Sequence, residues 1–329
     1  LDPDAVRRRA AVVLERARAR FADLPVVRAY PPGADAETKE FVRYWFDPYA
    51  RRQLAALADS VRRVHEPAER RALWCAFSRL IITKQSGASR AMDLSHSRPH
   101  KKFEVAPTKP FNKFLEAVET VVTNVPHRRS GKTGPAVTTT LGDARRLPIR
   151  SGSVDLVLTS PPYLNAIDYM RCSKFSLAWM GYSLARLRRL RGRSIGAEVS
   201  LSPKATKGRI EEIIRELRLR PRLQGRDAAI FARYIKDMDA SLREVARILT
   251  AAGQAIYVVG NSSVHGTFVR NSAVVEAVAI RNGLRLIKKR TRSLPPNRRY
   301  LPPPAAPNAG ATFSSRMRQE VVLSFKRAA

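Results

Sequence analysis

The sequence has little cysteine and no long apolar run. Its two cysteines, Cys75 and Cys172, lie far apart with no CxxC and no Cys/His cluster. This spacing argues against a structural zinc site and indicates a reducing compartment. No apolar stretch approaches the ~18 residues of a membrane span, and residues 1–21 interleave charged and apolar side chains, unlike a signal peptide. We therefore expect a soluble cytoplasmic protein with no metal and no membrane partner.

Acidic residues are also scarce. The chain has 28 Asp and Glu against 61 Lys and Arg, a formal net charge of +33. Such an excess favours a polyanionic partner, because each basic side chain set against a phosphate releases condensed counterions. An Arg-rich and Ala-rich genome is the alternative source of the charge. The basic residues gather at 127–132, 185–193, 288–292 and 297–299, which we interpret as a DNA-tracking surface.

The chain changes character near residue 137. Before it, apolar periodicity predicts a mostly helical region, 1–126, and a linker at 127–136. The expected helices cover 4–24, 36–64, 67–84 and 110–124. After it, expected strands (137–144, 153–160, 253–263, 284–293 and 318–327) alternate with helices (165–190 and 227–250). That alternation predicts an α/β domain over 137–329, whose ligands gather beyond the carboxyl ends of the strands.

TSPPY, residues 159–163, follows the apolar run VDLVL, which is typical of a buried parallel strand. Prolines often end strands, but that role does not explain Ser160 and Tyr163. The exocyclic amine of a nucleobase is a weak nucleophile because its lone pair is delocalised into the ring. Acceptors on its N–H bonds favour tetrahedral geometry, and Ser160 Oγ and the Pro161 carbonyl are such acceptors, held by consecutive prolines that offer no N–H. Tyr163 offers an aromatic face to a base swung out of its duplex.

This motif resembles the catalytic motif of the amino-group DNA methyltransferases, and its serine form is similar to the N4-cytosine branch. GDARRLPIRSGSVDLVLTSPPY, 142–163, carries the strand, the Gly-Asp turn, the Leu-Pro pair and the second strand in the family's usual order. The resemblance implies a Rossmann-like domain that transfers a methyl group from S-adenosylmethionine to N4 of a flipped cytosine in double-stranded DNA, by direct in-line displacement. It assigns catalysis to Ser160, Pro161, Pro162 and Tyr163, and cofactor contacts to Asp143 and Thr159.

The family's glycine-rich turn for the methionine end of the cofactor is missing, since none of the 16 glycines forms a GxG. Three interpretations stay open. The chain is part of a longer enzyme whose first strands precede Leu1, or half of a split enzyme completed by a second polypeptide with that turn. In the third, it is a degenerate protein that binds DNA without methylating it.

Single residues also allow more than one interpretation. Adenine-N6 enzymes more often have Asp or Asn in place of Ser160, so N6 methylation in the same fold is the nearest rival; an RNA-directed enzyme is a more distant one. Asn261 is either a cap or a neighbour of the cofactor or base. Cys75 and Cys172 lack the Pro-Cys context of cytosine-C5 enzymes and are expected to be packing residues.

Overall fold

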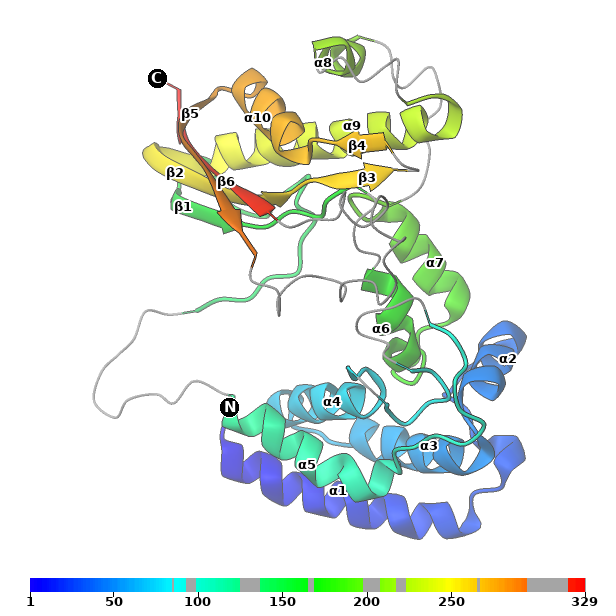
Figure 1. Ribbon diagram of the computed structural model, residues 1–329. Coiled ribbons are helices and arrows are strands. Elements are labelled where there is room, and N and C mark those ends of the chain that lie inside the picture. Colours follow the sequence, from blue (N-terminus) through cyan, green and yellow to red (C-terminus); the bar gives the residue numbers. More distant parts are fainter. Residues whose placement is uncertain are drawn as a thin grey trace. The chain divides into compact units, whose positions relative to one another are not determined.

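A computed structural model gives the structure of the chain (Figure 1). It describes residues 1–84, 86–92, 99–124, 137–164, 169–197, 208–216, 223–264, 267–294 and 319–328. They form two compact units, described separately below: unit 1 is Leu1–Ala136 with Tyr169–Leu190, and unit 2 is Val137–Asp168 with Arg191–Ala329. The expected linker 127–136 and the basic stretches 127–132 and 297–299 lie outside the described residues.

Unit 1 is helical in its described part. An acidic residue followed by proline begins three of its helices: the side chains of Asp2, Asp47 and Glu66 each accept a backbone N–H bond from the first turn. Proline at the first helical position needs no partner for its nitrogen, so the pair is a strong start signal. The elements are α1 (Pro3–Asp23), η1 (Val26–Arg28), α2 (Ala36–Trp45), α3 (Pro48–Arg62), α4 (Pro67–Ile81), α5 (Pro110–Thr123), α6 (Tyr169–Leu177) and most of α7 (Leu184–Arg193).

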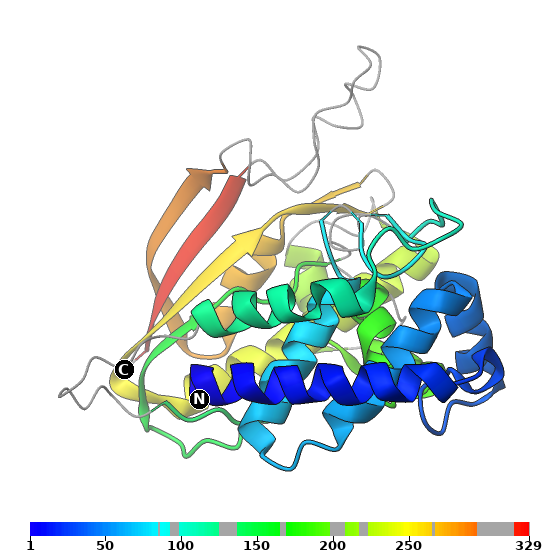
Figure 2. The ribbon, with the colours of Figure 1, turned by 90° about the horizontal axis from the view of Figure 1, so that it is seen from below.

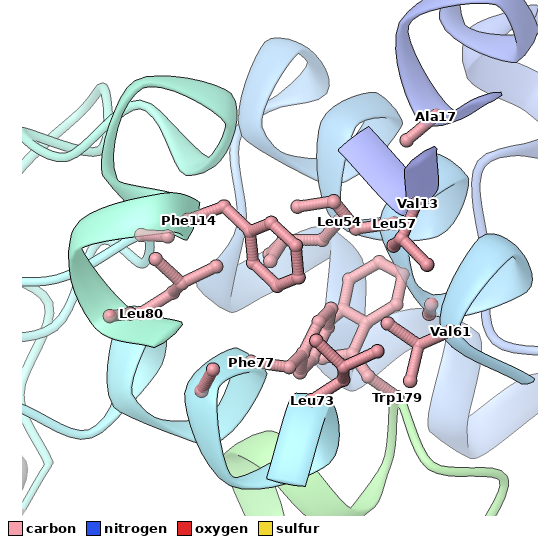
Figure 3. Close-up of a cluster of buried hydrophobic side chains, with 14 of the residues drawn as sticks. Val13, Ala17, Leu54, Leu57, Val61, Leu73, Phe77, Leu80, Phe114 and Trp179 are labelled. Atoms are coloured by element: carbon pink, nitrogen blue, oxygen red, sulfur yellow. The ribbon is translucent and has the colours of Figure 1, made fainter. Parts of the chain in front are cut away.

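The helices of unit 1 pack around one apolar core (Figure 3). α1 and α5 lie side by side, as Figure 2 shows, and α1 also packs on α3. The core includes Phe175 of α6 and Trp179 just beyond it, and both side chains are fully buried. Trp179 meets Phe46 edge-to-face at a centroid distance of 5.4 Å. Phe175 and Trp179, which follow the Pro-Pro motif (TSPPY, 159–163) along the chain, are therefore part of the helical core.

Unit 2 contains a four-stranded sheet in the order β1-β2-β6-β5. β1 is parallel to β2, and β6 is antiparallel to both of its neighbours. Therefore β1, β2 and β5 run in the same direction. The elements are β1 (Val154–Thr159), α8 (Arg209–Glu216), α9 (Gly225–Ile248), β2 (Leu249–Gly260), β3 (Ser262–Val264), β4 (Thr267–Val269), α10 (Asn271–Arg281), β5 (Leu284–Ser293) and β6 (Gln319–Arg327). β3 and β4 form a separate antiparallel pair.

One face of the sheet is packed against α9 and α10 (Figure 1). Alternate residues of β2 point into this second core, because side chains on a strand have a period of two. Ala255, Tyr257 and Val259 are buried there, whereas Ile256 and Val258 on the opposite face are only half-buried. The core of unit 2 therefore lies on one side of the sheet.

The predicted fold class, a Rossmann-like α/β domain with an N-terminal helical region, is confirmed: strands that run parallel are connected through helices. The helix expected at 36–64 is divided, because Asp47 caps a new helix that begins at Pro48. Two helices, α8 and α10, were not predicted. Cys75 is exposed, so its assignment to packing is wrong, whereas Cys172 is half-buried.

The prediction of a strand at 137–144 is wrong. Residues 137–142 adopt no regular structure, and Val137 and Leu141 are 89% and 99% exposed. A strand needs a neighbour to complete its backbone hydrogen bonds, and none of the described strands pairs with this segment.

Among the helices that the structure describes, none is long and apolar enough to cross a membrane. The described His, Cys, Asp and Glu residues form no group that could hold a metal ion.

Candidate functional site

The Pro-Pro motif lies at the carboxyl end of β1, as the sequence predicts. Thr159 is the last residue of the strand and pairs with Tyr257 of β2. Ser160 is exposed, Pro161 and Pro162 are half-buried, and the side chain of Tyr163 is buried. The expectation of a buried strand is wrong, because β1 stands at the edge of the described sheet with Leu156 and Leu158 56% and 69% exposed.

The hydroxyl groups of Ser160 and Tyr163 are hydrogen-bonded to each other. Its Oγ lies 3.1 Å from the Tyr163 hydroxyl, and that hydroxyl donates to the Val258 carbonyl at 3.4 Å. A phenol has a single proton. With that proton directed to Val258, the Ser160 hydroxyl donates to Tyr163, and its own lone pairs remain available. In this arrangement Ser160 Oγ can accept a further hydrogen bond.

The Tyr163 ring packs within the core of unit 2, together with Tyr257 and Val259. Tyr234 is fully buried in the same cluster, and burial raises the pKa of its phenol far above the ordinary value. Hydrogen bonds in such an apolar setting are electrostatically stronger than in water. Stacking of Tyr163 on a flipped base needs the ring to present a face outward, and that role stays a prediction.

Three residues outside the motif hold its backbone. Ser262 Oγ donates to the Leu164 carbonyl at 2.6 Å, and Asn271 Nδ2 donates to that same Oγ at 3.0 Å and to the Gly260 carbonyl at 3.0 Å. Gly196 lies against the motif with a φ of +77°, and a Cβ there would come 3.4 Å from both Pro162 Cβ and the Tyr163 carbonyl oxygen. The conformation of the loop is therefore set by the β2–β3 junction, by α10 and by a close glycine.

Asp143 belongs to an ion-pair network that is centred on Arg145. Arg145 binds both of its carboxylate oxygens, through Nε at 3.0 Å and Nη2 at 2.8 Å, and through its backbone N–H at 3.0 Å. The same guanidinium reaches the buried carboxylate of Asp237 at 2.8 Å. Hydrogen bonds from Arg145 lower the pKa of Asp143 to about 2. Asp143 is thus ionised at neutral pH and half-exposed, so its free lone pairs can accept a further N–H donor.

Sequence reasoning overlooked several of these residues. Gly196, Ser262 and Asn271 lie 33, 99 and 108 positions after Tyr163, and no local pattern marks them. Arg145 could have been noticed, since an arginine two residues after a turn aspartate can reach its carboxylate. Asn261 Oδ1 accepts from the backbone N–H and the hydroxyl of Ser272 in the first turn of α10, whose N-cap residue is Arg270. A position of Asn261 near the cofactor or base stays a prediction.

Basic side chains line β5 at the far edge of the sheet. Lys288 and Arg290 are exposed and stand beside Ser324 and Val322 of β6. Lys289 points to the other face and pairs with Glu276 of α10 at 2.6 Å. In unit 1, Arg188 of the other basic segment, 185–193, is engaged by Glu37, Nη2 to Oε2 at 2.7 Å. The basic segments therefore combine structural ion pairs with exposed cations.

No family model matches this sequence, and no curated protein matches it. Among solved structures, it is similar to TTHA0409 of Thermus thermophilus, a protein provisionally described as a DNA modification methylase. The selenomethionine derivative aligns with a TM-score of 0.31 and 16% identity, covering 57% of this chain and 53% of that one. The complex with S-adenosyl-L-methionine aligns with a TM-score of 0.29 and 18% identity, covering 57% and 54%. This chain thus spans about half the length of the structures that it matches.

Proposed function

We propose that this chain carries the base-binding half of a DNA methyltransferase that modifies the exocyclic N4 amine of cytosine, with S-adenosylmethionine as the methyl donor. The observation that supports this most directly is the hydroxyl chain from Ser160 through Tyr163 to Val258. It leaves the exposed serine as an acceptor next to the Pro161 carbonyl. Two acceptors at the end of a strand suit an NH₂ group with two N–H bonds.

In this proposal the two acceptors draw the N–H bonds of the target amine out of conjugation with its ring. The nitrogen lone pair then becomes available for transfer, and no covalent bond to the protein is formed. Pro161 and Pro162 hold the carbonyl rigidly, which reduces the entropy lost in reaching the reactive geometry. A base must leave the duplex to reach them, since the atom is inaccessible within the stack.

The cofactor fits this chain only in part. Asp143, ionised and half-exposed, is suited to accept an N–H bond from the cofactor's adenine, and Thr159 lies next to the acceptors at the strand end. For the methionine end, the sequence offers no GxG among its 16 glycines. The chain therefore supplies the acceptor side of the reaction and an incomplete cofactor site.

The test is Ser160→Ala, assayed for methyl transfer to duplex DNA with nucleoside mass spectrometry of the product. We expect a loss of about 10²-fold or more, the range for removing a group that acts on the reacting proton. Ser153→Ala, at the opposite end of β1, is the matched control, because the Ser153 hydroxyl donates to the Arg150 carbonyl, away from the motif. Normal turnover by a folded Ser160→Ala variant would refute the role, and N6-methyladenine in place of N4-methylcytosine would reassign the base.

A DNA-binding subunit without catalysis is the second candidate, and the missing GxG together with the net charge of +33 favours it. It predicts duplex binding that is unchanged by S-adenosylmethionine and by Ser160→Ala. Calorimetric titration of the protein with S-adenosylmethionine, alone and with DNA, separates this candidate from the enzyme.

A further inference from the structure

Arg51 of α3 is a buried arginine in unit 1, only 6% exposed. Its Nη2 donates to the Val26 carbonyl at 3.2 Å, and its Nε is buried with no hydrogen-bond partner. Among the described residues, no carboxylate forms an ion pair with its guanidinium. Arginine stays charged in proteins, and a buried charge is normally paired. The charge of Arg51 therefore lacks the partner that its burial calls for.

Two further arginines of unit 1 lie close enough to Arg51 to repel its charge. Burial lowers the pKa of the Arg51 guanidinium, and the positive charges of Arg43 and Arg90 lower it further. Tyr30 and Asp47 act in the opposite direction. The Asp47 carboxylate, however, already accepts three backbone N–H bonds. The surroundings of Arg51 therefore hold an excess of positive charge.

Arg90 is held in place by backbone carbonyl groups. Its Nε donates to the Glu104 carbonyl at 2.9 Å, and its Nη1 donates to the carbonyls of Arg43 and Tyr44 at 3.3 Å and 3.2 Å, at the carboxyl end of α2. None of these bonds uses Nη2. The Glu104 carboxylate is bound by Lys101 at 2.8 Å and 3.0 Å. Arg90 therefore has a fixed position, and it keeps both its charge and an N–H group for a further acceptor.

Tyr30 lies between Arg51 and a fourth cation. The guanidinium carbon of Arg51 is 4.8 Å from the centroid of the Tyr30 ring, and Lys39 Nζ is 6.0 Å from the same centroid. An aromatic ring attracts a cation but brings no net negative charge. Lys39 and Arg43 are both exposed and stand four positions apart on α2, so they share one face of that helix. Lys39, Arg43, Arg51, Arg90 and Tyr30 together are named the Arg51 cluster.

We propose that the Arg51 cluster is a binding site for a phosphate group, carried either by a nucleic-acid backbone or by a small phosphorylated compound. Guanidinium groups match phosphate oxygens in a bidentate manner. Arg90 Nη2 and the exposed Arg43 supply direct donors, and the buried charge of Arg51 adds an attraction that salt screens only weakly. A carboxylate, with two oxygens and one charge, suits four cations less well. The site belongs to unit 1 and does not depend on the methyl-transfer chemistry proposed above.

The test is a titration of this 329-residue chain with inorganic phosphate at constant ionic strength, followed by the NMR resonance of the Arg51 Nε–H group. Because that group is buried, its exchange with water is slow. We expect a saturable shift, and a Kd at least about tenfold weaker in Arg43→Ala, which loses a hydrogen bond to a charged group. Arg8→Ala is the matched control, since Arg8 is 73% exposed near the amino end of α1.

Thermal unfolding is the second measurement, with phosphate compared against chloride at equal ionic strength. A ligand that binds only the folded state raises the midpoint. We expect phosphate to raise the midpoints of the unmodified chain and of Arg8→Ala, and to raise that of Arg43→Ala less. An Arg51 resonance that phosphate does not move, or equal phosphate affinities of Arg43→Ala and Arg8→Ala, overturns the proposal.

A short DNA duplex distinguishes the two sources of the phosphate group. If the ligand is a nucleic-acid phosphate, the duplex moves the same Arg51 resonance, inorganic phosphate competes with the duplex, and Arg43→Ala weakens duplex binding more than Arg8→Ala does. If the ligand is a small phosphorylated compound, inorganic phosphate moves the resonance, and the two substitutions change duplex binding equally. Either result supports a phosphate site at the Arg51 cluster.

Discussion

At the scale of residues, Tyr163 has two proposed roles: its hydroxyl hydrogen-bonds to Ser160, and its ring stacks on the base. Substitution of the hydroxyl alone distinguishes them. Tyr163→Phe keeps the ring and removes the donor to Val258 and the partner of Ser160. If the hydroxyl chain prepares Ser160, the phenylalanine variant loses turnover, with little change in affinity for DNA that carries an extruded base. Tyr163→Ala also removes any stacking, worth ~1–3 kcal/mol per base. Full turnover by Tyr163→Phe would leave stacking or packing as the only role of Tyr163.

Arg145 lowers the pKa of Asp143. The folded pKa of Asp143, about 2, lies below the ~3.9 of an unfolded aspartate. The carboxylate therefore stabilises the fold fully above about pH 4, and this contribution is lost as the pH falls through about 2. Arg145→Ala should raise the pKa of Asp143 toward ~3.9 and flatten the fall in unfolding free energy across that interval.

Carboxyl-carbon NMR titration and urea unfolding between about pH 2 and pH 5 measure the two effects of Arg145→Ala. Arg146→Ala is the control, because Arg146 meets Asp143 through a backbone bond to its carbonyl, which the substitution keeps. An unchanged pKa of Asp143 in Arg145→Ala would contradict the assignment of the shift to this guanidinium.

At the scale of elements, unit 1 depends on a side chain that comes from beyond the Pro-Pro motif in the sequence. Trp179 is fully buried beside Phe46, so Trp179→Ala should lower the free energy of unfolding by about 3–5 kcal/mol. Val27→Ala, at a residue 79% exposed, should change it by about 0.5 kcal/mol or less. Urea unfolding of both variants tests this, and equal midpoints would remove Trp179 from the core.

Elements marked by local chemistry were predictable from the sequence, and elements that depend on a partner were not. Asp47 and Pro48 are a local signal for the beginning of α3. The strands β2 and β6 are apolar enough to be predicted from the sequence. Residues 137–141 have the right composition for a strand but have no described neighbour to pair with. At the site, the position of Ser160 at the end of β1 followed from the sequence, whereas its contact with Tyr163 and the support from Ser262 depend on loop geometry.

At the scale of the whole molecule, the net charge of +33 predicts DNA binding that weakens steeply with salt. The slope of log K against log salt is about −0.9 per phosphate neutralised. If Lys288 and Arg290 each contact a phosphate, Lys288→Ala/Arg290→Ala should reduce the slope by about 1.8. Lys289→Ala is the control, because Lys289 is paired with Glu276 on the other face. Fluorescence anisotropy with a short duplex measures the slope. An unchanged slope would show that Lys288 and Arg290 of β5 do not contact the DNA.

The exposed leucines of β1, Leu156 and Leu158, affect the expected steady-state amount of this protein in a cell. An apolar strand edge in contact with water is the type of surface that nucleates aggregation, and cells submit such surfaces to chaperones and proteases. We expect the steady-state abundance of the chain to follow the dosage of whatever shields Leu156 and Leu158. Chains made in excess of the component that covers these leucines would be degraded and would not accumulate.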